Sequence, residues 1–252
     1  MDKQKTVSEQ GSTAAPATFY IKITANGPYL VYGHPTINQE IICPNDEGTS
    51  WVYRQGRSFD NSAEPIALCR CGKSNNKPYC DGTHQHAFWS PEETSDKRPL
   101  LEDAEGYEGP EMILADNEKY CAFARFCDAY GRVWNLVERA RTREEKELVR
   151  HEAGHCPAGR LVLYEKESGK VYEPPFEPSL GLIEDPGIKV SGPIWVKGGI
   201  RIESADGTNY EIRNRVTLCR CGQSMNKPFC DGTHASYHFH DGIPIEENGK
   251  EW

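Results

Sequence analysis

The chain is short of apolar residues, of positive charge and of long hydrophobic runs. Hydrophobic residues make up 37% of its 252 residues, and no run approaches the roughly 20 apolar residues that a membrane-spanning helix needs. Its 29 Lys and Arg are outnumbered by 38 Asp and Glu, and the formal net charge is −9. Because binding to phosphates requires an excess of positive charge, this composition argues against nucleic acid. We therefore expect partners that are neither nucleic acid nor membrane.

Targeting and catalytic signals are also absent from the sequence. Residues 1–17 are polar and lack the apolar stretch of a secretion signal, so we interpret them as a disordered tail. Ten cysteines without a secretion signal favour a reducing, cytoplasmic location, where clustered thiols are more often metal ligands than disulfides. The sequence contains neither a phosphate-binding loop nor a dinucleotide fingerprint. We therefore do not expect an enzyme.

What the chain does have is a phrase of 17 residues that occurs twice. Residues 68–84 read LCRCGKSNNKPYCDGTH, and residues 218–234 read LCRCGQSMNKPFCDGTH, with 14 positions identical. A packed core does not need three thiols and one imidazole at fixed spacing, whereas a metal site does. The candidate ligands are Cys69, Cys71, Cys80 and His84 in the first copy, and Cys219, Cys221, Cys230 and His234 in the second.

Three thiols and one imidazole can hold zinc as well as iron. In each phrase a single residue separates the first two cysteines, which is close enough for both to reach one iron. Zinc sites usually space their cysteine pairs by about two to four residues, so this spacing favours iron and leaves zinc as the alternative. Pro78 and Gly82 shape the turn that carries the third thiol and the imidazole.

The pattern C-x-C-x2-S-x3-P-x-C-D-G-T-H resembles the motif of the CDGSH iron–sulfur (NEET-type) family, with Thr where the family name has Ser. The resemblance implies that each copy binds a [2Fe–2S] cluster through its three Cys and one His, with iron as the metal. Because a neutral imidazole replaces one thiolate, such a cluster is less negative than an all-Cys cluster. We expect its reduction potential to be correspondingly higher.

Each phrase ends a longer repeated module. Both modules begin with Gly-Pro, an apolar strand and a second Gly, from Gly27 to Gly33 in the first copy and from Gly192 to Gly198 in the second. We therefore divide the chain beyond the tail into a first CDGSH-type module, an acidic linker, a middle unit, a Pro-rich linker and a second CDGSH-type module, at residues 18–89, 90–110, 111–173, 174–190 and 191–252.

The middle unit contains three further cysteines in the pattern C-x5-C-x28-C-P, namely Cys121, Cys127 and Cys156. The pattern resembles that of single-cluster ferredoxins and of a divergent mono-cluster domain found beside CDGSH motifs. It lacks the cysteine that a [4Fe–4S] version would carry near Ala124. The resemblance implies a third cluster, either [3Fe–4S] or [4Fe–4S] with a fourth ligand other than Cys. The alternative is that these are buried structural cysteines.

Thr142 and Glu145 form a capping pattern that predicts a helix over 143–153.

The resemblance also implies a fold and a function. Family members with one motif pair as homodimers through β-strands, so two motifs in one chain imply a monomer with an internal pseudo-dimer rather than a homodimer. We expect a mainly β protein with a small α+β insertion, in which two β-rich modules form the pseudo-dimer and the middle unit is ferredoxin-like. The alternatives are three flexibly linked units or dimerisation between chains.

Several clusters in one chain favour electron transfer with a redox partner. One alternative is iron–sulfur cluster storage, sensing or transfer to an apo-acceptor protein, because clusters of this family can be released to acceptors. The other is a zinc-stapled interaction module.

Overall fold

The computed structural model describes residues 13–247 and 250–251. Most of the predicted disordered tail, 1–17, therefore lies outside the described residues. Its last part packs on the second module, since the backbone N–H of Ala15 donates to the carbonyl of Gly199 at 2.9 Å. Gly199 has no Cβ, and a Cβ there would overlap the carbonyl of Thr13. The prediction of disorder is thus wrong for residues 13–17. This segment can pack on the second module because Gly199 has no side chain in its way.

The first sheet has four strands in the order β11-β1-β2-β5. β1 (Tyr20–Ile23), β2 (Tyr29–Tyr32) and β5 (Ile66–Leu68) come from the first module, and β2 runs antiparallel to both of its neighbours. β11 (Arg201–Glu203) comes from the second module and lies parallel to β1. Alternate residues of β1 and β2 are buried, which is the period of two expected of a strand with one face on the core.

The second sheet has five strands in the order β12-β10-β9-β3-β4. β9 (Ser179–Asp185), β10 (Val190–Lys197) and β12 (Arg215–Leu218) are antiparallel neighbours. β3 (Thr36–Pro44) comes from the first module and lies parallel to β9, and β4 (Ser50–Ser58) returns antiparallel beside it. The β3–β4 hairpin accounts for the extra residues of the first module.

The two sheets share one plan. β1, β2 and β5 of the first sheet correspond to β9, β10 and β12 of the second, and each set is completed by a parallel strand from the other half of the chain. Neither half can therefore complete its sheet alone. The expected intramolecular pseudo-dimer of two β-rich modules is confirmed, and the two halves exchange a strand.

Both predicted linkers contain structured segments. The predicted Pro-rich linker, 174–190, includes all of β9, the central strand of the second sheet, and six of the seven β9 residues are buried. The prolines around this strand hid it from the sequence analysis. The predicted acidic linker, 90–110, is held along the second module, where the backbone N–H groups of Thr94 and Ser95 both donate to the carbonyl of Lys227 at 2.8 Å. The linker interpretation is wrong for these parts.

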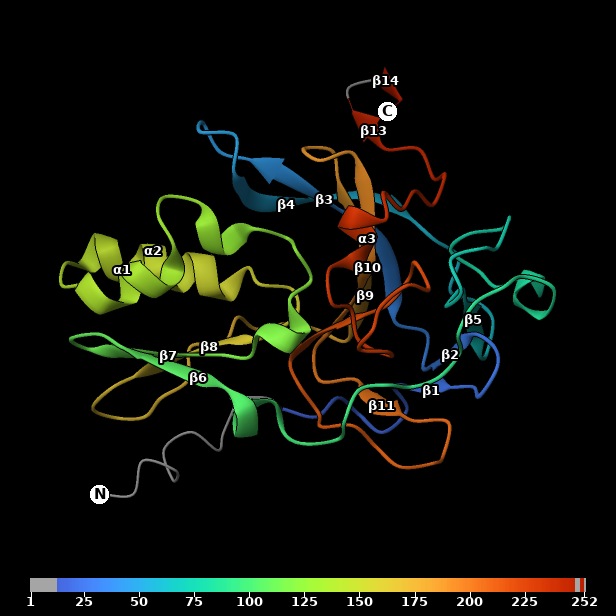
Figure 1. Cartoon of the computed structure of the whole chain (residues 1–252), viewed down its shortest axis with the longest axis horizontal. Coiled ribbons are helices and arrows are strands. Elements are labelled where there is room, and N and C mark those ends of the chain that lie inside the picture. Colours follow the sequence, from blue (N-terminus) through green and yellow to red (C-terminus); the bar gives the residue numbers. More distant parts are fainter. Residues whose placement is uncertain (1–12, 248–249, 252) are drawn as a thin grey trace.

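The middle unit is a small α+β layer at the side of the two sheets, on the left in Figure 1. β6 (Glu105–Glu108), β7 (Met112–Asp116) and β8 (Leu161–Glu165) form an antiparallel sheet, and α1 (Val133–Arg139) and α2 (Arg143–Gly154) lie along it. Thr142 and Glu145 form the predicted capping box at the start of α2. The remaining short elements are η1 (Thr83–Gln85), η2 (Leu100–Asp103), η3 (Glu118–Tyr120), η4 (Phe126–Asp128), α3 (Thr233–Ser236), β13 (Glu246–Glu247) and β14 (Lys250–Glu251).

One hydrophobic core runs through all three parts of the chain. It joins side chains of both modules and of the middle unit, for example Ile21 and Val31, Leu114 and Val137, and Leu180 and Ile194. The alternative of three units on flexible linkers is therefore wrong, because burying these side chains together fixes the units against one another. Among the described residues, no helix has the length and apolar character needed to cross a bilayer.

Candidate metal centres

The first phrase brings its four candidate ligands together at the end of β5. Cys69 and Cys71 follow this strand directly, and their Sγ atoms lie 3.8 Å apart. The chain then turns back, so that the Sγ of Cys80 lies 3.3 Å from Nδ1 of His84. The donors are thus arranged as two pairs, one of two thiols and one of a thiol and an imidazole.

Residues of the phrase itself fix the turn between these pairs. Gly82 has a φ of 86°, in the left-handed region that favours glycine. The carboxylate of Asp81 accepts hydrogen bonds from the backbone N–H groups of Asn75 at 2.8 Å and Thr83 at 2.9 Å. The Asp and Gly of the motif therefore close the loop, and the ligands are left free for metal.

The second phrase repeats this geometry in different surroundings. The Sγ atoms of Cys219 and Cys221 lie 3.8 Å apart, and the Sγ of Cys230 lies 3.4 Å from Nδ1 of His234. Gly232 has the same φ of 86° as its counterpart. Because two copies with different neighbours adopt one geometry, the phrase itself determines the arrangement of the donors.

The paired donors match a group that contains two metal ions. Within the described part of the chain, no three or more Cys, His, Asp or Glu side chains converge on one point as a single ion would require. A tetrahedral zinc ion needs all four of its ligands at one point. A two-iron cluster needs two protein ligands on each of two separate irons. Each phrase thus supplies the two donor pairs that a two-iron cluster needs.

Each loop favours a thiolate on its first cysteine. The pKa of Cys69 is lowered to about 6, first by a hydrogen bond with the thiol of Cys71 and then, against the effect of burial, by the backbone N–H groups of Ser74 and Gly72. The pKa of Cys219 is lowered to about 7 by the corresponding groups. Since the thiolate is the form that binds metal, the first cysteine of each loop is the most easily ionised ligand, whereas the pKa values of the other cysteines in both loops are raised.

A lysine adds positive charge beside each first cysteine. The ammonium groups of Lys77 and Lys227 donate to the carbonyls of Ser74 and Ser224, each at 2.6 Å. Each ammonium also contributes to lowering the pKa of the first cysteine of its own loop. These lysines are therefore held against the sites and are not freely solvated side chains.

The three cysteines of the middle unit all act electrostatically on one buried arginine, Arg160. Arg160 forms an ion pair with Asp116 at 3.0 Å. Burial disfavours its charge, but Cys156, Cys121 and Cys127 act with Asp116 to raise the pKa of Arg160. Burial raises the pKa of Cys121, and that of Cys127 to about 12. Buried thiols that would be costly to ionise alone, next to a buried cation, fit an anionic cluster held by three thiolates.

His155 and Cys43, which are also of ligand type, lie outside this group. His155 follows α2 next to Cys156, but its Nδ1 contacts the carbonyl of His151 at 2.8 Å and its ring stacks on Phe126. Cys43 lies in β3, with its Sγ 3.7 Å from the carbonyl of Ile41. All ten cysteines are free, and nine of them belong to the three candidate sites.

Comparison with family models divides the chain as its motifs predict. A model described as an iron-binding zinc finger of the CDGSH type matches residues 26–85 and 191–235, and one described as a divergent 4Fe-4S mono-cluster matches residues 107–166. The chain is thus similar to the CDGSH family in these two segments. It is an iron–sulfur protein with two CDGSH segments and a divergent mono-cluster segment between them. A search of the curated proteins found no match, and neither did a search of the solved structures.

Each CDGSH site contains a buried arginine that the sequence analysis missed. Arg70 lies between the first two cysteines of its loop and is only 1% exposed. Its guanidinium donates to three backbone carbonyls, those of Gly27, Thr24 and Pro91, at 2.8–3.0 Å, and it packs on Trp89. Among the described residues no carboxylate forms an ion pair with Arg70. A buried cation held only by carbonyls fits a site that binds an anion, and a cluster held by three thiolates is anionic.

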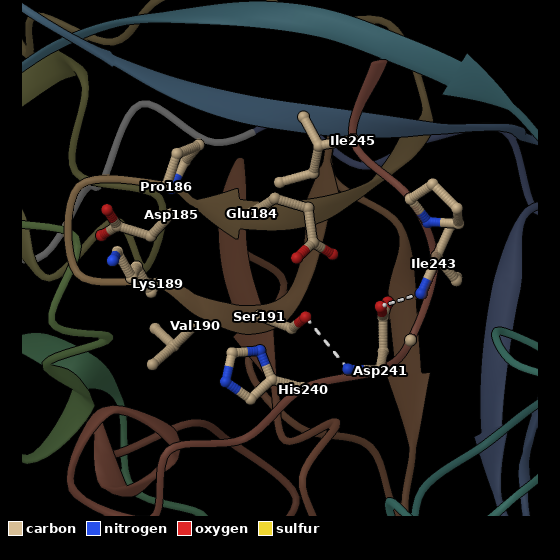
Figure 2. A pocket seen from close by; sticks show the side chains of 12 residues that line it. Glu184, Asp185, Pro186, Lys189, Val190, Ser191, His240, Asp241, Ile243 and Ile245 are labelled. Atoms are coloured by element: carbon tan, nitrogen blue, oxygen red, sulfur yellow. Dashed lines mark hydrogen bonds between the residues drawn. The ribbon is translucent and has the colours of Figure 1, made fainter. Parts of the chain in front are cut away.

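Arg220 is the counterpart of Arg70, but its partners differ. It also donates to backbone carbonyls, and in addition forms ion pairs with Glu184 at 2.8 Å and Asp241 at 2.7 Å. Figure 2 shows both carboxylates on the wall of a cavity of about 420 Å³. Asp241 is fixed there by bonds to Ser191 and Ile243. Burial raises the pKa of Glu184 to about 8, against the opposing effect of Arg220.

The two CDGSH loops contact each other through their backbones. A Cβ on Gly72 would lie 2.4 Å from the carbonyl oxygen of Cys221, and a Cβ on Gly222 would lie 2.4 Å from that of Cys71. The hydroxyl of Tyr29, in β2 of the first module, donates to the carbonyl of Cys219 at 2.9 Å. The pseudo-dimer therefore places the two sites directly side by side, and only glycine fits at the contact.

The middle site adjoins the second CDGSH site. A Cβ on Gly232 would lie 3.1 Å from the carbonyl oxygen of Cys121. The side chain of Asn226 donates to the carbonyl of Lys119 at 3.0 Å. Thus the loop that carries the first middle-unit cysteine packs on the loop that carries Cys230 and His234. All three sites are connected by backbone contacts.

Proposed function

We propose that this protein transfers electrons through three iron–sulfur clusters. Each CDGSH site holds one [2Fe–2S] cluster, with Cys69 and Cys71 on one iron of the first cluster and Cys80 and His84 on the other. The corresponding residues of the second phrase hold the second cluster. When bound, the clusters supply one-electron chemistry, and the protein binds, spaces and insulates them.

The middle unit holds a third cluster through Cys121, Cys127 and Cys156. Three thiols equal the ligand number of a [3Fe–4S] cluster. A [4Fe–4S] cluster would need a ligand other than Cys on its fourth iron. In either form, Arg160 supplies a buried positive charge that favours an anionic group at this place.

One observation carries the electron-transfer proposal. The three sites are joined by the Gly72–Cys221, Gly222–Cys71 and Gly232–Cys121 backbone contacts. A protein that used its metals only as structural staples would gain nothing from placing all three in contact. Contiguous sites are what an electron relay requires.

Metal analysis and electron paramagnetic resonance (EPR) of the purified protein test the proposal. Two [2Fe–2S] clusters contain 4 irons, and a third cluster raises the total to about 7 or 8 irons per chain. We expect reversible reduction without loss of iron, and a signal from the as-isolated protein if the middle cluster is [3Fe–4S]. A colourless protein that contains zinc and no iron would overturn the proposal in favour of the zinc-stapled module.

Cluster delivery is the second candidate, because the first site lies nearer to solvent. Cys80 and His84 are half-buried, whereas Cys230 and His234 are buried. Mixing the loaded protein with an apo-ferredoxin separates the two functions. Delivery predicts that the acceptor gains a cluster, and electron transfer predicts that both proteins keep their iron through a reduction cycle.

A further inference from the structure

The two phrases are nearly identical, yet their sites have different surroundings. We propose that the second CDGSH cluster is an internal relay of low reduction potential, and that the first is the outlet of higher potential to an external acceptor. The relay joins the middle site to the outlet. This inference rests on the proposed function and adds the order of the sites and the direction of electron flow.

Equivalent glycines show the difference in exposure. Gly82 and Gly232 have the same backbone conformation, with φ 86° and ψ −5°. In the described part of the chain, a Cβ on Gly82 would meet no atom within 4 Å, whereas one on Gly232 would meet Cys121 and Phe123 of the middle unit. The middle unit therefore packs against the loop of the second site, where Cys230 and His234 are buried, whereas Cys80 and His84 of the first site are half-buried. An external protein reaches the first site more easily.

Equivalent arginines show the difference in charge. The offset of 150 residues between the phrases places Pro91 where the second module has Asp241. Correspondingly, Arg70 contacts the carbonyl of Pro91, whereas Arg220 contacts the carboxylate of Asp241. The charge of the second arginine is thus balanced by the carboxylate of Asp241, while the first arginine contacts only backbone carbonyls at the corresponding places.

A second acidic side chain, that of Glu184, is also present only at the second site. Arg70 and Arg220 donate in the same way to the carbonyls of Thr24 and Ile183, so the next residues, Ala25 and Glu184, also correspond. Glu184 forms an ion pair with Arg220 at 2.8 Å. The first module has an alanine at that place. Because burial raises the pKa of Glu184 to about 8, Glu184 adds a full negative charge only at higher pH, and Asp241 accounts for the difference in charge at neutral pH.

The sign of the effect follows from electrostatics. Reduction adds one negative charge to a cluster. A neighbouring cation stabilises that charge, and neighbouring carboxylates or burial away from water oppose it. The first site is nearer to solvent and contains Arg70, which has no carboxylate partner among the described residues. The second site is buried and contains Arg220 paired with Asp241. Transfer of an electron from the second site to the first would therefore lower the free energy.

Contacts between the loops set the order of the sites. The second CDGSH loop touches the first through Gly222 and touches the middle unit through Gly232. Two residues of the second phrase, Asn226 and Gly232, contact the middle unit. The second cluster therefore stands between the other two.

An EPR-monitored redox titration of the loaded, full-length protein tests the difference in potential. We expect two separate midpoint potentials for the [2Fe–2S] clusters. Cys80→Ser and Cys230→Ser, which each remove one cluster, assign them. Asp241→Asn removes a charge at the second site and should shift only the lower potential upward. Equal potentials in the wild type, or a lower potential that Asp241→Asn leaves unmoved, would overturn the inference.

Pro91→Asp is the matched control. It places a carboxylate at the position of the first module that corresponds to Asp241, and should shift only the higher potential downward. A downward shift of the lower potential, or no shift of either, would show that the charge at this position does not set the potential.

If Asp241→Asn does not fold, a measurement on the wild-type protein tests the inference instead. A soluble dysprosium chelate added to the reduced protein speeds the spin relaxation of exposed clusters. We expect the signal assigned to Cys80 and His84 to relax faster than that of the second cluster. Equal enhancement for both would overturn the inference.

If the protein lacks two [2Fe–2S] clusters, the proposed function itself fails, whereas two clusters of equal potential and equal access refute only the relay.

Discussion

Gly72 of the first CDGSH loop lies against the carbonyl oxygen of Cys221 in the second, so closely that a Cβ at Gly72 would come within 2.4 Å of that oxygen. The reciprocal contact joins Gly222 to Cys71. The two sites of the pseudo-dimer therefore share one interface, and a change on one side of it affects both.

Gly72→Ala should destabilise the protein and loosen both CDGSH clusters. The new Cβ meets rigid backbone, and Gly72 has a φ of 74°, which costs a non-glycine residue about 1 kcal/mol by itself. Gly207→Ala is the control, because Gly207 has a φ of 85° but open space for a Cβ. Thermal unfolding and iron content measure the effect. A loss of stability no greater than that of Gly207→Ala would contradict the contact.

Cys156→Ser should remove the middle cluster alone. Because this thiol is one of the three proposed ligands of the middle cluster, its loss should lower the iron content by about 3 or 4 per chain. The visible spectrum of the CDGSH clusters should remain. Cys43→Ser is the control, since Cys43 lies in β3 outside the three sites. Iron analysis decides, and equal iron in both variants would assign the three middle cysteines a structural role.

His84→Cys should lower the reduction potential of the first cluster. A thiolate in place of a neutral imidazole adds one negative charge, which opposes reduction. His234→Cys should do the same at the second site. The measurement is a redox titration of each variant with its cluster bound. A potential equal to that of the wild type in either variant would show that the histidine is not a ligand there.

Glu152 should make the protein less stable as the pH rises from about 4.5 to 8. Burial raises its pKa from 4.5 to about 8, and one of its carboxylate oxygens has no hydrogen-bond partner among the described residues. In this pH range the folded state keeps a proton that the unfolded state releases. The free energy of unfolding therefore falls with pH, by at most about 1.4 kcal/mol per pH unit.

Glu152→Gln should remove this slope. The amide cannot ionise, so the variant should gain stability relative to the wild type as the pH rises. Urea unfolding at several pH values between 5 and 8 measures both proteins. The prediction fails if the two curves of unfolding free energy against pH run parallel.

The spacing of the two phrases is sufficient to predict the ligand pairs. Cys69, Cys71, Cys80 and His84 lie within 16 residues, and their loop is closed by its own Asp81 and Gly82. Because this geometry is local, the rest of the fold has little influence on how the four donors are arranged. The capping box at Thr142 was predictable for the same reason. Arg70 and Arg220 are equally visible as identical residues of the phrases, but their burial is not.

β9 shows where sequence patterns fail. Its residues SLGLIED lie between prolines and glycines, which made the segment resemble a linker. In the structure it is the central strand of the second sheet, paired on one side with β10 and on the other with β3. The β3–β9 pairing joins residues more than 130 positions apart, and no local pattern records a partner at that distance.

The sequence by itself determined what the protein binds. Three thiols and an imidazole at fixed spacing, present twice, predict a metal site and favour iron, because metal ligation depends on atoms only a few residues apart. The tertiary structure alone decided that the two sites are unequal. Packing sets the middle unit over Gly232 and leaves Gly82 open, and it sets Asp241 beside Arg220 where Pro91 faces Arg70. Exposure and local charge depend on distant neighbours, and those neighbours meet only in the folded chain.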